Sequence, residues 1–254
     1  VECNNPKMFR NQYDSDVTVF SPQGRLHQID YAVEAMRQGS AAVAIRSKDY
    51  AVVVALMRAQ NELSSYQQKV FKLDDHLGLS MSGLISDGRI LARFMQSECA
   101  EFRWNYHNPI SVELLNRKLG LKLQSNTQYY GRRPFGVGLL IIGYDDKGPH
   151  VVKAEPSGDV SEMFAASIGA RSQSARTYLE KNLPEFETAD RDALIRHAIR
   201  SLKETLQADA GSLDENNTSI AIIGLGQPFT FLGKDATRAH IRSVEEEAHR
   251  EMDE

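Results

Sequence analysis

Short apolar segments and amphipathic helical patterns alternate in blocks along this chain, and this order constrains the fold more than any other feature of the sequence. Four strand-like runs are followed by two helical patterns, the same order recurs once, and strands close the chain. Apolar strands need cover on both faces, so the order predicts two packed sheets with helices outside each. The expected fold is therefore α+β, a four-layer αββα sandwich, and no linker divides it.

Hydrophobic periodicity places the individual elements. Apolar runs bounded by polar turns predict strands at 41–45, 51–56, 70–73, 77–81, 137–144, 150–154, 219–223 and 229–231. Apolar residues three and four positions apart predict helices over 25–37, from Leu84 onward, from Asn108-Pro109, around Tyr178 and over 194–206. The stripe after Leu84 contains Ile90 and Cys99, which are therefore expected to face the core.

Three segments follow from these elements. Residues 1–24 are polar and end in the turn-forming run Ser21-Pro22-Gln23-Gly24, which indicates an arm rather than part of the core. Residues 25–242 are expected to form one domain. Residues 243–254 are acidic and are expected to be a solvated tail.

Composition excludes several classes of function. The chain has 254 residues, a formal net charge of −4 and no basic patch, so neither nucleic acids nor anionic membranes are expected partners. No apolar run approaches the ~20 residues that span a bilayer. The start has no secretory pattern and there are only two cysteines, so an intracellular protein is expected. The seven histidines lack metal-ligand spacing and no phosphate-binding glycine loop is present, so no metal or cofactor is expected.

A long run near the N-terminus, YDSDVTVFSPQGRLHQIDYA from Tyr13 to Ala32, resembles the signature with which proteasome alpha subunits begin. The resemblance continues through MSGLISDGRIL, TQYYGRRPFGVGLLIIGYD and NNTSIAIIG, and covers nearly the whole chain from Met8. The start MFRNQYD and the run IGARSQSARTYLE are most similar to the alpha subunit at the sixth ring position. Residues 1–7 do not fit this start and are expected to be an extension or a remnant of cloning.

The resemblance implies the fold of the N-terminal-nucleophile hydrolases without their chemistry. In the catalytic beta relatives, a threonine with a free amine begins the first strand and serves as nucleophile and base. Ser40 occupies the similar place, but Gly39 precedes it, so its amine lies in a peptide bond. Leu56 stands where the supporting aspartate is expected, and Lys69 resembles the active-site lysine by position. The implied function is that of a non-catalytic subunit in ubiquitin-dependent protein degradation.

Two sets of residues are expected to act instead. By resemblance, Tyr13, Asp14, Pro22 and Tyr31 match the cluster that stabilises the open gate over the axial pore, and Ser15 replaces the arginine of the family triplet Tyr-Asp-Arg. Another set matches the pocket between adjacent alpha subunits that receives the C-terminal carboxylate of an activator; it consists of Leu26, Gly39 and Lys69. The implied partners are other alpha subunits in a seven-membered ring, the beta subunits of the inner ring, and a regulatory particle or other activator. The implied location is the cytoplasm and nucleus.

Two other functions compete with this interpretation. A self-processing amidohydrolase of the same fold would cleave after Gly39 to free Ser40, and the missing acid at Leu56 argues against it. A stand-alone peptide-binding module would require the purified chain to be a stable monomer. The mass of the chain and its state of assembly distinguish the three.

Overall fold

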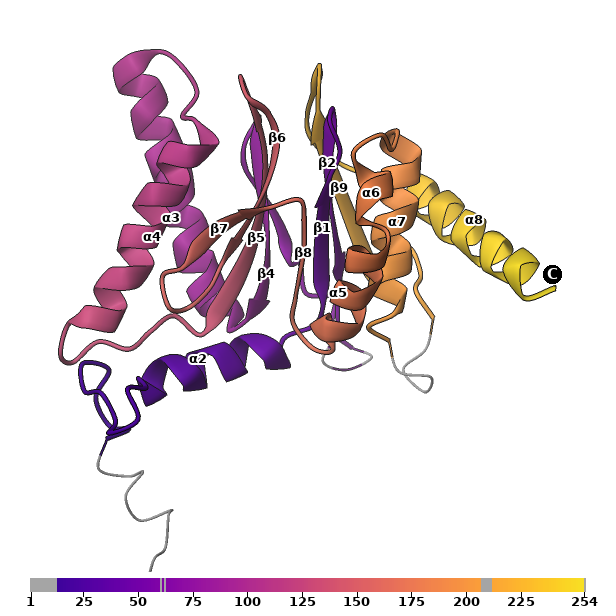
Figure 1. The fold of residues 1–254 in the computed structure, drawn as a ribbon. Coiled ribbons are helices and arrows are strands. Elements are labelled where there is room, and N and C mark those ends of the chain that lie inside the picture. Colours follow the sequence, from indigo (N-terminus) through magenta and orange to yellow (C-terminus); the bar gives the residue numbers. More distant parts are fainter. Residues whose placement is uncertain (1–12, 60, 62, 207–211, 254) are drawn as a thin grey trace, which may run out of the picture.

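Two five-stranded antiparallel sheets form the centre of the molecule in the computed structural model (Figure 1), which describes residues 13–59, 61, 63–206 and 212–253, with side chains up to 247. The first sheet has the order β10-β9-β2-β1-β8. Its strands are β1 (Ala42–Arg46), β2 (Tyr50–Leu56), β8 (Ala165–Ile168), β9 (Thr218–Gly224) and β10 (Gln227–Phe231). The second sheet has the order β3-β4-β5-β6-β7. Its strands are β3 (Val70–Asp74), β4 (Leu77–Gly83), β5 (Val137–Asp145), β6 (Gly148–Ala154) and β7 (Val160–Met163).

Helices cover the outer face of each sheet, as Figure 1 shows. The second sheet is covered by α3 (Ile85–Tyr106) and α4 (Val112–Gln128). The first is covered by α5 (Ser172–Lys181), α6 (Leu183–Phe186), α7 (Arg191–Lys203) and α8 (Lys234–Asp253). Helix α2 (His27–Gln38) lies across one end of the sandwich and packs against β4 and β5.

Three hydrophobic cores separate the four layers. One lies between the first sheet and its helices and includes Val43, Phe186 and Leu194. A second lies between the other sheet and α3 and α4. The third, which includes Val53 and Leu140, lies between the two sheets. Because each sheet contributes side chains to two cores, its strands are buried on both faces. The predicted αββα sandwich is confirmed.

The sequence prediction erred at several local positions. Helix α4 begins at Val112, and the Ser111 hydroxyl caps it by accepting a hydrogen bond from the Leu114 N–H at 3.4 Å, so Asn108-Pro109 precedes the helix. Ile90 is 53% exposed, whereas Cys99 is buried as expected. Strands β7 and β8 were not predicted, because they have four residues each, no residue of β7 is buried, and only Ala166 and Ile168 of β8 are buried. Among the described residues, no helix is long and apolar enough to cross a membrane.

The predicted acidic tail is the second half of a helix. Helix α8 runs from Lys234 to Asp253, so the boundary expected at 243 falls inside it. Val244 is only 2% exposed and belongs to the core between the first sheet and its helices. Glu247 forms ion pairs with Arg200 at 2.7 Å and Arg196 at 3.6 Å on α7. This part of the acidic segment is therefore packed against the domain.

This packing makes Val244 the first test of the corrected boundary. The substitution Val244→Ala is expected to lower the free energy of unfolding by about 2 kcal/mol, because it removes buried methyl groups and leaves a cavity. The exposed neighbour Glu246 supplies the control, since Glu246→Ala should change stability by no more than about 0.5 kcal/mol. Equal effects in urea unfolding would mean that the helix is not docked at Val244.

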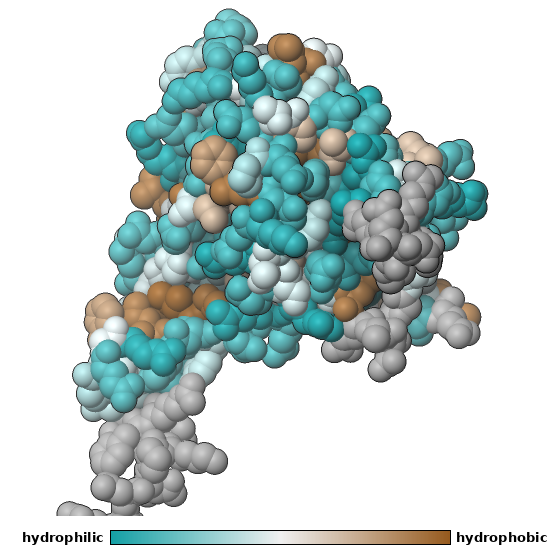
Figure 2. All heavy atoms as spheres, turned by 45° about the vertical axis from the view of Figure 1, so that its right-hand side comes forward, coloured by the Kyte–Doolittle hydropathy of each residue, from teal (hydrophilic) through white to brown (hydrophobic). Residues whose placement is uncertain are grey.

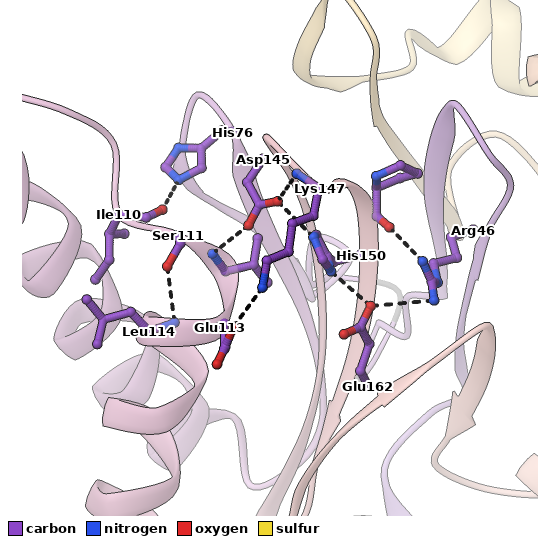
Figure 3. Close-up of polar contacts among 12 residues, drawn as sticks. Arg46, His76, Ile110, Ser111, Glu113, Leu114, Asp145, Lys147, His150 and Glu162 are labelled. Carbon is purple, nitrogen blue, oxygen red and sulfur yellow. Dashed lines mark hydrogen bonds and ion pairs between the residues drawn. The ribbon is translucent and has the colours of Figure 1, made fainter.

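A polar network joins α4 to both sheets (Figure 3). The His150 ring on β6 lies between two carboxylates, with Nε2 2.9 Å from Asp145 Oδ1 and Nδ1 2.9 Å from Glu162 Oε1. Asp145 also accepts the Val112 N–H at the start of α4, at 3.2 Å. Glu162 lies 3.5 Å from Arg46 on β1. Burial acts to raise the pKa of Asp145, but hydrogen bonds from the Lys147 N–H and from His150 outweigh it and lower that pKa.

Candidate functional site

The Ser40 side chain is held at the start of β1 by hydrogen bonds, and the residue has no free amine. Its hydroxyl donates to the Leu56 carbonyl oxygen at 2.8 Å and accepts a hydrogen bond from Lys69 Nζ at 2.7 Å. Lys69 Nζ also donates to the Ser40 carbonyl oxygen. The Ser40 nitrogen is in the peptide bond that follows Gly39, and Ser40 is only 8% exposed. The structure therefore places the Ser40 hydroxyl and Lys69 in direct contact, a contact that the sequence did not predict, and the Ser40 amine lies in a peptide bond.

Leu56 contributes an apolar side chain beside this cluster. Its side chain is 8% exposed and packs in the core between the first sheet and its helices. Its carbonyl oxygen faces Ser40, so the residue contributes a hydrogen-bond acceptor but no ionisable group. The side chain at this position, where the catalytic relatives have an aspartate, is therefore apolar and has no carboxylate.

Lys69 is buried rather than presented to solvent. It precedes β3 and is 3% exposed. Burial, together with the positive charge of Arg58, lowers the pKa of Lys69 from its ordinary value to about 7. A lysine with a depressed pKa beside a hydroxyl is typical of catalytic sites, but here its ammonium group is occupied by the Ser40 carbonyl oxygen and hydroxyl.

Gly39 is part of the same cluster and is tightly enclosed. A Cβ atom built on Gly39 would lie 2.2 Å from the Gly83 nitrogen and 2.3 Å from Ser82 Oγ. The Gly39 carbonyl oxygen accepts the Ala170 N–H at 2.7 Å. Ser82 was not predicted; its Oγ lies 3.1 Å from the carbonyl oxygens of both Ser40 and Met36. A serine inside an apolar strand, two positions after Ser80, was the only sequence signal for it.

Leu26 lies apart from the other two residues of the predicted activator pocket. It is the residue before α2, whereas Gly39 follows the last turn of that helix. A helix rises 1.5 Å per residue, so about 20 Å separate Leu26 from Gly39. Within one chain, the structure therefore brings Gly39 and Lys69 together around Ser40, and it leaves Leu26 at the opposite end of α2.

The predicted gate residues lie at the start of the described chain, where the arm runs onto α2. The Tyr31 hydroxyl donates to Asp14 Oδ2 at 3.1 Å, and Gln28 Nε2 donates to the Asp14 carbonyl oxygen. Tyr13 and Ser15 flank Asp14 in a bend, with Ser15 exposed. The structure thus pairs Asp14 with Tyr31, whereas residues 1–12, which include the segment 1–7, lie outside the described residues.

Pro22 lies in the predicted turn, which is closed by backbone hydrogen bonds. The Gly24 N–H donates to the Ser21 carbonyl oxygen at 2.8 Å, and the Ser21 N–H donates to the Arg25 carbonyl oxygen at 2.9 Å. Gly24 has φ +76°, a left-handed conformation that glycine adopts without strain. The turn reverses the arm directly before α2.

In the described part of the chain, no group of three or more metal-ligating side chains is present.

Comparisons with known proteins agree with this geometry. The family profile for a proteasome subunit matches residues 36–223, and the N-terminal signature of proteasome A subunits matches residues 13–35. The chain is 56% identical over 237 residues to proteasome subunit alpha type-1 of Caenorhabditis elegans, which covers 93% of this chain and 91% of the relative. It is 46% identical over 236 residues to proteasome subunit alpha type-6 of Saccharomyces cerevisiae, which covers 92% of this chain and 100% of the relative.

A third relative gives the same result. Proteasome subunit alpha type-1 of Drosophila melanogaster is 49% identical over 241 residues, which covers 94% of this chain and 86% of the relative. The signature matched at residues 13–35 contains the Asp14–Tyr31 pair and the Pro22 turn, and the longer match contains the Ser40 cluster. The chain therefore belongs to the proteasome subunit family and is one of its alpha-type subunits.

Proposed function

We propose that this chain is a structural, non-catalytic subunit of the outer alpha ring of the proteasome core, and that its N-terminal arm takes part in gating. The observation that carries the proposal is the Ser40 cluster. Nucleophilic catalysis of this type needs a free terminal amine, an orienting acid and an accessible hydroxyl. Here the Ser40 amine lies in a peptide bond, Leu56 supplies no acid, and the hydroxyl is buried.

Exposed apolar side chains support assembly with other subunits. Phe20, Leu84, Trp104 and Phe164 are between 46% and 83% exposed. Figure 2 shows a mostly hydrophilic face on which apolar residues gather in a band at the lower left. Exposed apolar patches mark protein–protein interfaces. We assign these exposed apolar side chains to contacts with neighbouring alpha subunits of a seven-membered ring and with the inner beta ring. The particle would act in the cytoplasm and nucleus and degrade ubiquitin-tagged proteins.

Native mass spectrometry of the endogenous complex tests assembly and processing together. An unprocessed chain, released from a particle that contains many partners of similar size, is the expected result. A chain shortened to begin at Ser40 would establish the self-processing amidohydrolase instead. A lone monomer would favour the stand-alone peptide-binding module.

The Asp14–Tyr31 hydrogen bond is the element on which gating would depend. It joins the side chains of Asp14 in the arm and Tyr31 on α2 at 3.1 Å, beside the hydrogen bond from Gln28 to the Asp14 carbonyl oxygen. A hydrogen bond to a charged group contributes about 1.5–3 kcal/mol. A contact of this size can shift an equilibrium between two arm arrangements without changing the fold.

The substitution Tyr31→Phe should reduce activator-stimulated peptide hydrolysis by the assembled particle about twofold to fivefold, because it removes this bond from the open arrangement. Assembly should be unchanged, since the aromatic side chain is retained. Tyr130→Phe provides the control, as Tyr130 is 85% exposed in the segment after α4. If both variants are stimulated to the same extent as the wild type, the bond has no part in gating.

Activator docking is proposed for Gly39 and Lys69 together with Leu26. Since about 20 Å separate Leu26 from Gly39 in one chain, a pocket that uses all three would combine Leu26 of one subunit with Gly39 and Lys69 of its neighbour. An activator carboxylate that reached Lys69 would replace its hydrogen bond to the Ser40 carbonyl oxygen. A Lys69→Met variant that still bound activator would refute this role.

A further inference from the structure

A cleft of about 590 Å³ lies beside the Ser40 cluster and has a lining unlike that of the cluster itself. Its walls include Ala41, which follows Ser40, and Leu56, which hydrogen-bonds Ser40. The rest of the lining includes Met57, Arg58, Arg171 and Leu206. This set contains two guanidinium groups and no carboxylate among the residues that the structure describes. Its volume is in the range of ligand sites.

A backbone hydrogen bond fixes the loop that carries Arg58, and a side-chain hydrogen bond fixes Arg171. Arg58 follows β2 and is exposed, and its carbonyl oxygen accepts the Gln67 N–H at 3.1 Å, which closes the loop on which it lies. Arg171 precedes α5 and donates from Nη1 to the Leu206 carbonyl oxygen at 3.2 Å. Its φ of +55° lies in the left-handed region, which is unfavourable for a residue with a Cβ. Strain of this kind is often retained where it positions a side chain for function.

The two charged side chains in the described lining are both positive, and one of them affects the neighbouring cluster. Arg58 contributes to the lowering of the pKa of Lys69, so its positive charge reaches into that cluster. Like charges within a concave site focus the field and attract anions. Guanidinium groups pair with carboxylates through two parallel hydrogen bonds. Leu56, Met57 and Leu206 supply apolar surface in the same lining.

We propose that this cleft binds acidic peptide segments, with Arg58 and Arg171 each pairing with a side-chain carboxylate and an intervening apolar residue packing on the cleft wall. The two cations lie on separate segments, one after β2 and one before α5, so a peptide with two separated carboxylates matches the lining better than a single anion. The bound peptide is not cleaved. This function is separate from gating, because the cleft lies beside Ser40, beyond the last turn of α2, whereas Asp14 contacts the first half of that helix.

Fluorescence anisotropy on the purified full chain tests the proposal. The probe is a labelled, N-acetylated and C-amidated peptide with two glutamates on either side of a leucine, and the matched peptide carries glutamines instead. The blocked ends leave the side chains as the only carboxylates. The glutamate peptide should bind at least about tenfold more tightly, and its affinity should fall as salt is raised, because its carboxylates form charge-assisted hydrogen bonds that salt screens.

The substitution Arg58→Gln should weaken binding of the glutamate peptide about tenfold. Arg89→Gln is the matched control, since Arg89 is exposed on α3 and does not line the cleft. Arg171→Lys keeps the charge but loses the planar fork, and it should weaken binding less than Arg171→Gln does. Equal binding of the two peptides, or equal effects of Arg58→Gln and Arg89→Gln, would overturn the proposal. If inorganic phosphate displaced the labelled peptide at the same concentration as the unlabelled glutamate peptide does, the cleft would be a site for simple anions instead.

Discussion

Replacing Gly39 by alanine is expected to lower the free energy of unfolding by about 3 kcal/mol or more, because the added methyl group would overlap neighbouring backbone atoms. The added Cβ would lie 2.2 Å from the Gly83 nitrogen and 2.9 Å from the Ser82 carbonyl carbon. Both are backbone atoms at the end of β4, and they have no side-chain torsion that could relieve the overlap. The end of α2 and the start of β1 would have to move away from β4.

The movement would also affect the Ser40 cluster. Gly39 is bonded to Ser40, and its carbonyl oxygen accepts the Ala170 N–H, so a shift of Gly39 disturbs both contacts. We therefore expect Gly39→Ala to reduce incorporation of the chain into the particle as well as its stability.

Gly233→Ala is the matched control for this substitution. A Cβ at Gly233 has no atom within 4 Å, and its backbone is not in the left-handed region. Its stability should change by no more than about 0.5 kcal/mol. Urea unfolding of both variants measures the difference. If the Gly39→Ala chain were as stable as the Gly233→Ala chain, the backbone at the contact between α2 and β4 could move at little cost in free energy, and the prediction would be wrong.

The order of the layers could be predicted from the sequence because each layer has its own hydrophobic period. The runs in β1, β2 and β5 are apolar on both faces, and only a buried sheet accommodates them. Strands β7 and β8 carry residues such as Ser161 and Ser167, and they lie at the edges of their sheets. Edge strands need fewer apolar residues, so periodicity alone did not reveal them.

Helix α8 was missed for the opposite reason. The charges around Glu245 indicated a solvated segment, but Thr237, Ile241 and Val244 follow the spacing of one helix face and are all buried. That pattern was present in the sequence and was outweighed by the acidic composition. Its clearest consequence is the ion pair of Glu247 with Arg200, in which an acidic residue of the expected tail holds the helix against α7.

The candidate site was predictable in its chemistry but not in its burial. Gly39 before Ser40 and Leu56 in place of an acid can be read directly from the sequence. Lysines are usually exposed, so no pattern indicated that Lys69 is 3% exposed and hydrogen-bonded to Ser40. The cationic cleft was missed because its two arginines are far apart in the chain and are brought together only by the fold.

The burial of Lys69 should appear as a pH dependence of stability. Between pH 7 and the pKa of an ordinary lysine near 10.5, Lys69 is protonated in the unfolded chain and neutral in the folded chain. Unfolding then takes up a proton, so the free energy of unfolding rises with pH through this window. Below pH 7 the lysine is charged in both states and contributes no slope.

The substitution Lys69→Met removes this group, and its stability should therefore change less with pH than that of the wild type. The difference in slope approaches about 1.4 kcal/mol per pH unit, or about 3 kcal/mol between pH 7.5 and 9.5, with the methionine variant gaining most at the lower pH. Lys48→Met is the control, because Lys48 is exposed in the turn between β1 and β2. Urea unfolding at pH 7.5, 8.5 and 9.5 measures all three chains. If the free energies of unfolding of the wild type and Lys69→Met changed in parallel with pH, Lys69 would have to remain charged in the folded chain. The Ser40 carbonyl oxygen and hydroxyl would then bind an ammonium group at all three pH values.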